Sequence, residues 1–84
     1  IELAIKMANL LRGRQKYKST LMFLENIEKE YPNHSLLPKA KFLHSKLLFE
    51  EFGRDKEALD ILSKTIEAFP KSSWIEPMQK QVST

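Results

Sequence analysis

The sequence has no cysteine, only two glycines and a single tryptophan among its 84 residues. The absence of cysteine excludes a disulfide framework, thiolate metal ligands and cysteine-based catalysis. Four prolines, two glycines and 42% hydrophobic residues argue against disordered, collagen-like or other low-complexity structure. No apolar run reaches the roughly 18 residues that a membrane-spanning helix needs. We therefore expect one small globular domain with a single core.

An internal repeat is the strongest pattern in the sequence. Residues 20–35 superpose on residues 58–73 with a constant offset of 38. Upstream, Gly13 pairs with Gly53 at an offset of 40, which predicts two additional residues in the first turn. Each copy consists of a segment, a glycine turn, a second segment and an aromatic residue followed by proline. We therefore expect one domain composed of a first repeat at about 1–35, a second at about 36–73 and a terminal helix at about 74–82.

Apolar residues recur every three or four positions within the segments, as in amphipathic helices. Leu3, Met7 and Leu10 form such a series in the first segment. The segment 36–52 is apolar over a wider arc, which is typical of a helix with neighbours on both sides. No alternating run of β-branched residues has the length of a strand, so we expect no sheet. The predicted helices span residues 1–12, 16–31, 36–52, 55–69 and 74–82.

Local signals predict how these helices end and begin. Gly13 and Gly53 can adopt the positive φ that closes a helix C-terminus. Asp55 lies two residues after Gly53 and is predicted to cap the next helix with its carboxylate. Ser73 and Glu76 have the spacing of a capping box at the start of the terminal helix. The two glycine turns therefore predict tight helical hairpins.

Paired helices that are separated by a glycine turn, ended by aromatic-Pro and repeated at 38 residues resemble the tetratricopeptide repeat. The segment from Gly53 is similar to the turn motif of that family, with Ala58 as the small contact between two helices and Pro70 as the closing proline. In the first copy, Tyr17 and Thr20 stand at the positions of the family's aromatic residue and alanine. The period exceeds the usual 34 or so residues, as in the looser repeats of bacterial envelope proteins. The resemblance implies an all-α, right-handed stack of helical hairpins, an α-solenoid of about five helices.

The resemblance also implies a function. Members of the family bind peptides or proteins on a concave surface lined by the first helix of each pair. We therefore expect a scaffold for protein interactions, as the soluble part of a larger membrane-anchored bacterial protein whose contact with membrane would come from flanking sequence. The candidate contacts to an acidic segment or a C-terminal carboxylate are the polar residues of those first helices: Lys6, Asn9, Lys41, His44 and Lys46.

The sequence gives no set of residues suited to catalysis or metal binding. Catalysis needs a nucleophile beside a base, or an acid and a base in different environments, and we find neither. His34 and His44 lie ten residues apart with no third ligand at helical spacing. The glutamates of the predicted helices, Glu28 among them, are interpreted as solvated surface. We expect no enzyme, no metal and no cofactor.

Positive charge gathers at the first turn. Residues 1–24 hold five basic residues against one acidic residue, whereas residues 25–84 hold nine against ten. A solvated turn is one interpretation; contact with anionic lipid headgroups, or with nucleic acid on which Tyr17 could stack, are the others. Nucleic acid is the weaker alternative. The basic patch consists of Arg12, Arg14, Lys16 and Lys18.

Self-association is the second hypothesis for function. A helical hairpin buries only one side of itself, so the two ends of a stack need cover. The terminal helix is expected to cover the second hairpin, and its outer face together with the first helix could pair between chains to form a homo-oligomer. The candidate residues on the terminal helix are Trp74, Ile75, Met78 and Val82.

Overall fold

The computed structural model describes the backbone of residues 1–83 and the side chains of residues 1–80. Within this range the chain is all-α, with five helices and no strand. The elements are α1 (Glu2–Gly13), α2 (Tyr17–Glu30), α3 (Leu37–Leu47) with its π-helical extension η1 (Leu48–Phe52), α4 (Asp55–Ala68) and α5 (Ile75–Ser83). The predicted all-α class is confirmed, and each predicted helix boundary agrees with the structure to within one residue.

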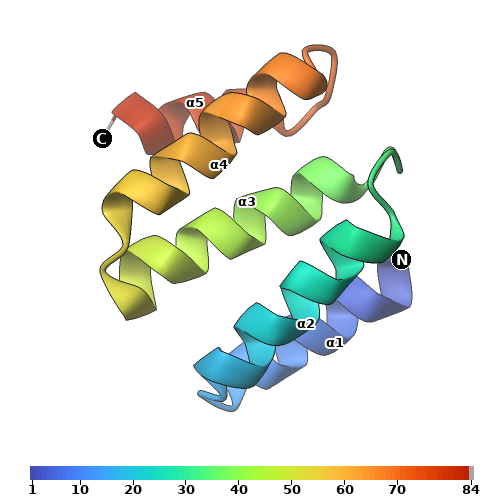
Figure 1. Ribbon diagram of the computed structural model, residues 1–84, viewed down its shortest axis with the longest axis vertical. Coiled ribbons are helices and arrows are strands. Elements are labelled where there is room, and N and C mark those ends of the chain that lie inside the picture. The colour runs from blue at the N-terminus through green and yellow to red at the C-terminus, as the bar shows by residue number, and fades with distance from the viewer. Residues whose placement is uncertain (84) are drawn as a thin grey trace.

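Neighbouring helices in the sequence are also neighbours in space. The helices pack in succession, α1 on α2, α2 on α3, α3 on α4 and α4 on α5. In Figure 1, α3 lies between α2 and α4, with α1 behind α2 and α5 behind α4. The molecule is broad and flat, with extents of 30 × 26 × 17 Å. This order of contacts is compatible with stacked hairpins, and the right-handed solenoid stays a prediction.

The repeat seen in the sequence extends to the backbone geometry. The two helices that end each copy, α2 and α4, both have 14 residues. Their C-caps, Tyr31 and Phe69, have φ/ψ of −126°/56° and −129°/61°. The loops continue alike, because His34 N–H donates to the Tyr31 carbonyl at 3.3 Å and Ser72 N–H donates to the Phe69 carbonyl at 3.1 Å. From the second helix of each copy through the following loop, the two copies therefore share their backbone path at an offset of 38 as well as their residue pattern.

The left-handed residue of the first turn is not the one expected from the sequence. Gly53 has φ 62°, as predicted, but Gly13 remains the last residue of α1, and the positive φ of the first turn falls on Gln15 at 63°. Gln15 lies 38 residues before Gly53, and each directly precedes the N-cap of the next helix, Lys16 or Arg54. The expected offset of 40 between the two turns is therefore wrong. The start of the second helix fixes the left-handed position, whichever residue stands there.

The predicted cap at Asp55 is also wrong. Arg54 is the N-cap of α4, without a side-chain cap hydrogen bond, and Asp55 is the first helical residue. Its carboxylate still lies at the positive end of the helix dipole, which favours an acidic residue. Before α5, the Oγ atom of Ser72, one residue ahead of the predicted Ser73, accepts the Trp74 N–H at 3.2 Å. The side-chain hydrogen bond before α5 therefore comes from Ser72 and not from the predicted Ser73.

The π-helical turn η1 adds one residue to the second copy. Lys16 N–H donates to the carbonyl of Leu11, five residues back, at 3.0 Å. At the equivalent N-cap, Arg54 N–H donates to the carbonyl of Leu48, six residues back, at 3.0 Å. Leu11 therefore corresponds to Leu48, and a residue of α1 corresponds to the residue of α3 that lies 37 positions later.

The register of 37 brings similar environments together. It aligns Ala8 of α1 with Ser45 of α3, and these two small side chains are 1% and 0% exposed. Small residues at this position allow the paired helix to approach closely. In the second hairpin, Ala58 of α4 is also fully buried, as expected of the small contact between α3 and α4.

The hydrophobic core is shared by the first three helices. Leu62 of α4 and Met78 of α5 are fully buried as well, so burial continues through the second hairpin. Because every helix contributes at least one buried apolar side chain, removing one of them should weaken the whole stack. The buried cluster of the first three helices consists of Ile5 and Ala8, Leu24 and Ile27, and Ala40 and Leu47.

Substitution by alanine should change the free energy of unfolding in opposite directions at Gly13 and Gly53. A Cβ atom would meet nothing within 4 Å at either position, so backbone conformation decides the outcome. Gly13→Ala should raise the free energy of unfolding by about 0.5–1 kcal/mol, because glycine is a poor helix former. Gly53→Ala should lower it by about 1–2 kcal/mol, because alanine is strained at positive φ. Urea denaturation followed by circular dichroism measures both, and effects of the same sign would contradict the assignment of the two turns.

Candidate functional site

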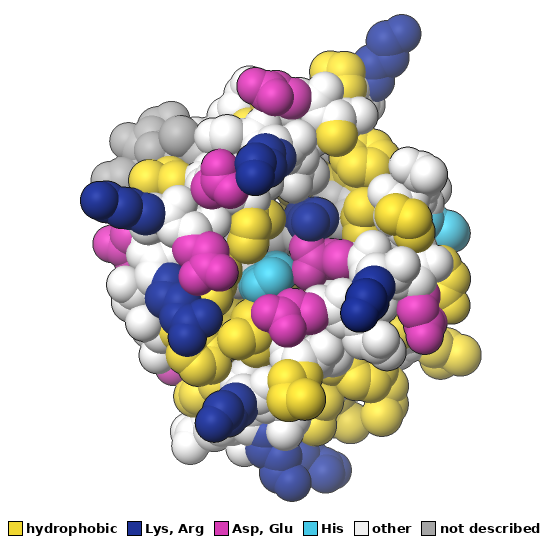
Figure 2. All heavy atoms as spheres, in the orientation of Figure 1, with side chains coloured by type: hydrophobic (Ala, Val, Ile, Leu, Met, Phe, Trp, Pro, Cys, Tyr) yellow, Lys and Arg dark blue, Asp and Glu magenta, His cyan; other side chains and the backbone are white. Residues whose placement is uncertain are grey.

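A hollow of about 350 Å³ opens between α2, α3 and α4. Figure 2 shows a histidine near the middle of the face that these helices form, with acidic and basic side chains around it. We call this hollow the α3 hollow, because residues of α3 lie between its two walls. Its apolar lining comes from Pro32, Leu37, Ile61, Ala68 and Phe69, and its polar lining from Glu28, Lys41, Asp60, Lys64 and Thr65.

A charged cluster joins α2 to α3 at the α3 hollow. The Lys41 Nζ atom lies 2.7 Å from Oε1 of Glu28, and the His44 Nδ1 atom lies 2.7 Å from Oε2. Because a carboxylate only accepts hydrogen bonds, Nδ1 of His44 carries the hydrogen in this pair. The side chains of Glu28 and His44 are only 12% and 9% exposed. One carboxylate of α2 therefore holds two side chains that lie one turn apart on α3.

The environment of Glu28 keeps its carboxyl group ionised. Burial raises the pKa of Glu28, but hydrogen bonding and electrostatic attraction from His44 and Lys41 lower it, and the net result is a pKa below the usual value. The charged form is therefore compensated by its two partners, as a largely buried carboxylate requires. The interpretation of Glu28 as solvated surface is wrong.

The cluster belongs to one place in the chain and does not recur with the repeat. The residues of α1 that correspond to Lys41 and His44 are Ala4 and Met7, at the offset of 37. Neither can donate a hydrogen bond to a carboxylate. Spacing alone could have indicated that Lys41 and His44 share a helix face, but nothing in the sequence identifies Glu28 as their partner.

Of the residues predicted to contact a partner, some lie together at the α3 hollow and the others lie away from it. Lys41 and His44 lie together, although both already hold Glu28. Lys46 is half-buried and lies two residues beyond His44, which places it on a different side of α3. Lys6 and Asn9 are exposed on α1. None of these last three residues lines the α3 hollow.

One residue of the predicted basic patch, Arg12, is engaged in a contact within the chain. Arg12 of α1 forms an ion pair with Glu50 of η1. Arg14, Lys16 and Lys18 are exposed. Tyr17, which was expected to be able to stack on a base, packs against the hydrophobic core. The first turn therefore offers three exposed cations without an aromatic platform beside them.

Of the residues predicted for self-association on the terminal helix, one is buried and two are half-buried. Met78 is fully buried and is therefore unavailable to a second chain in this conformation. The Trp74 ring packs on Phe42 of α3 at a centroid distance of 5.6 Å, and the Lys39 Nζ atom lies 5.9 Å from its centroid. Ile75 is half-buried, and Val82 lies outside the residues whose side chains are described. The terminal helix therefore covers the second hairpin.

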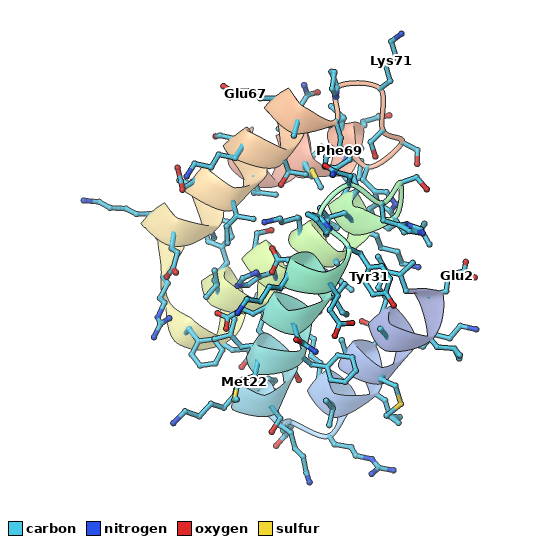
Figure 3. All side chains as sticks on the ribbon, turned by 45° about the vertical axis from the view of Figure 1, so that its right-hand side comes forward. Glu2, Met22, Tyr31, Glu67, Phe69 and Lys71 are labelled. Carbon is cyan, nitrogen blue, oxygen red and sulfur yellow. The ribbon has the colours of Figure 1, made fainter. Side chains whose placement is uncertain are left out.

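A second hollow, of about 410 Å³, lies between residues 35–36 and the loop 69–74. Lys71 is the single charged residue among the described residues that line it, and Figure 3 shows Lys71 projecting away from the body of the molecule. This hollow is built largely from one loop. The α3 hollow, by contrast, is lined by three helices and has paired charges at its edge, so it is the better candidate for specific binding.

The described residues include neither a cluster of metal ligands nor a helix that could span a membrane. No three histidine, cysteine, aspartate or glutamate side chains there come together in a way that could hold a metal ion. None of the helices in that part of the chain combines the length and apolar character needed to cross a bilayer. His34 has a local contact instead, since its Nδ1 atom accepts the Leu36 N–H at 3.0 Å.

Comparison of the chain with models of protein families, with curated proteins and with solved structures gave no match. The resemblance to the tetratricopeptide repeat therefore stays a prediction from the motif residues of the sequence.

Removal of the Glu28 charge should destabilise the protein in a pH-dependent manner. Glu28→Gln should lower the free energy of unfolding at pH 7 by about 1–3 kcal/mol, because glutamine carries no negative charge and offers one acceptor oxygen to Lys41 and His44 in place of two. Since folding lowers the pKa of Glu28, its stabilisation is complete above the unfolded pKa, near 4.5, and is lost as the pH falls through the folded pKa. The difference between the wild type and the variant should therefore shrink below about pH 4.5.

Urea denaturation between pH 3 and 7 measures this difference. Glu25→Gln, at an exposed position on the same helix, is the matched control and should have little effect. A difference for Glu28→Gln that stays constant over this pH range would contradict the proposed role of the carboxylate.

Proposed function

We propose that the chain is a protein-interaction module of the tetratricopeptide kind, which holds a segment of a partner protein in the α3 hollow. The observation that carries the proposal is the lining of this hollow by three helices, with apolar walls and paired charges at its edge. Such a surface can bury apolar side chains of a partner while charged groups fix their orientation. The repeated helices and caps support the likeness to helical-repeat scaffolds.

The charged groups at the edge indicate the chemistry of the partner. Lys64 and Asp60 form a pair at 3.0 Å, but their side chains are 75% and 60% exposed. An exposed pair of this kind contributes little to stability, so Lys64 can exchange Asp60 for a carboxylate of a partner. Lys41 is 30% exposed and holds Glu28, which keeps its ammonium group at the hollow.

The walls indicate what lies beside that carboxylate. Leu37, Ile61 and Phe69 contribute apolar surface from α3, from α4 and from the end of α4. Figure 3 shows where Phe69 lies, at the end of α4. A hollow of about 350 Å³ is at the small end of ligand pockets. We therefore propose as the partner a peptide segment with one or two apolar side chains next to an acidic residue.

Binding is favoured over catalysis by the state of the charged groups. Glu28, Lys41 and His44 satisfy one another, which suits a structural junction better than a site that must exchange protons with a substrate. Binding of nucleic acid at the first turn has less support, because Arg12 is paired with Glu50 and Tyr17 packs against the core.

Peptides selected on the folded protein should depend on Lys64. The probe is a set of fluorescein-labelled peptides enriched from a random display library, with dissociation constants measured by fluorescence anisotropy. Lys64→Glu should weaken their binding roughly tenfold or more, because it replaces an attractive charge with a repulsive one. Ile61→Asp should weaken it as well, through loss of apolar contact.

Lys71→Glu is the matched control, since it makes the same change at an exposed position outside the α3 hollow. Peptides that bind the Lys64→Glu and Lys71→Glu variants equally well would place the binding surface elsewhere and would refute the proposal.

A further inference from the structure

A second surface, separate from the α3 hollow, lies on α1. Leu3, Met7 and Leu10 are 78%, 49% and 52% exposed. Their spacing of four and three residues places them in one stripe along the helix. We call this the α1 stripe. Three large apolar side chains in a continuous row on a charged, water-facing helix mark a surface that is suited to contact with another molecule.

Because the chain is repeated, α3 has a face that corresponds to the α1 stripe. At the offset of 37, the α1 stripe corresponds to Ala40, His44 and Leu47 of α3. These three residues are 0%, 7% and 0% exposed. The face that is exposed to solvent on α1 is therefore buried on α3.

The element that covers the stripe of α3 is α2. Ala40 and Leu47 share a buried cluster with Leu24 of α2, and His44 is hydrogen-bonded to Glu28. The corresponding face of α1 therefore has the register of a helix-docking surface, and a helix with an apolar stripe is the element that fits it.

A second copy of the chain can supply such a helix. Among the described residues, the large exposed apolar side chains outside the stripe are Met22 and Tyr31. Figure 3 shows Met22 on the side of α2 that points away from α1, and Tyr31 is the C-cap of α2. No other helix face in the described part of the chain offers a comparable row. Within a second copy, the surface that matches the α1 stripe in apolar character is therefore the α1 stripe of that copy.

We propose that two copies of this protein associate through their α1 stripes, with the two helices antiparallel about a two-fold axis near Met7. A two-fold arrangement lets one patch serve as its own complement. It also places Glu2, at the start of one α1, near the basic end of the other, where Arg14 is exposed. In this arrangement the positive end of each α1 helix dipole lies near the negative end of the other, and this attraction favours the dimer.

The size of the contact sets the expected strength. A helix of 12 residues is about 18 Å long, so a pair of such helices buries less than the roughly 800 Å² per partner of a standard interface. We therefore expect a reversible dimer with a dissociation constant in the micromolar range or weaker. The α3 hollow takes no part in it, so the dimer and the proposed binding of peptides can succeed or fail independently.

Sedimentation velocity from about 5 to 500 µM tests the proposal. The wild type should shift from monomer to dimer as the concentration rises, and Met7→Glu should raise the dissociation constant at least tenfold. Circular dichroism of Met7→Glu checks that the exposed substitution leaves the helices folded. Met22→Glu is the matched control, because it makes the same change at an exposed methionine of α2, and it should leave the dimer unchanged. Lys64→Glu should leave it unchanged as well.

The absence of cysteine allows a second measurement. Met7→Cys should give a disulfide-linked dimer under mild oxidation, because the two copies of this residue lie nearest the axis, whereas Met22→Cys should stay monomeric. A wild type that remains monomeric at every concentration would overturn the proposal and would reserve the α1 stripe for a different partner. A dimer that survives Met7→Glu would overturn it too, by placing the contact elsewhere.

Discussion

The double burial of α3 is the constraint on which the rest of the structure depends. One side of this helix contributes Ala40 and Leu47 to the cluster formed with α1 and α2. The helix α4, whose Ala58 is fully buried, also packs against α3. Because α3 packs on both α2 and α4, it joins the first hairpin to the second. The wide apolar arc of residues 36–52 is the sequence counterpart of this position. The small side chains at Ala40, Ser45 and Ala58 let the neighbouring helices approach it closely.

A polar junction is added to this apolar packing. Aliphatic side chains fix the distance between helices better than they fix the register, because many arrangements bury similar area. The Glu28 carboxylate must meet both Lys41 and His44, which few registers of α2 on α3 allow. The junction also brings charge to the edge of the α3 hollow. The contact of Glu28 with Lys41 and His44 therefore has two roles. It limits the register of α2 on α3, and it supplies part of the polar edge of the proposed binding surface.

The sequence predicted the helices well because each carries an apolar period and an aromatic-Pro or glycine boundary that acts locally. It was wrong about the first turn, where Gln15 accepts the left-handed conformation although Gly13 is two residues away. Glycine favours that conformation but does not determine where the chain needs it. In both turns that conformation falls on the residue directly before the N-cap of the next helix.

The charged cluster illustrates a different limit of prediction. Lys41 and His44 could be placed on one helix face by counting, but the approach of Glu28 depends on how α2 crosses α3. Exposure could not be predicted either. Leu3, Met7 and Leu10 have the same spacing as residues of a buried face, and only the arrangement of all five helices shows that α1 leaves them uncovered.

The π-helical turn has a consequence for how the two copies diverge. An α-helix advances by 100° per residue, so one inserted residue would turn everything upstream by more than a quarter of a revolution if the helix stayed regular. The wider loop of η1 absorbs that insertion within five residues, Leu48–Phe52, and leaves α3 and α4 still facing each other. Insertion and compensation thus occur in the same turn. A sequence comparison with one fixed period therefore misaligns the two copies on one side of η1, although their helices still correspond in the structure.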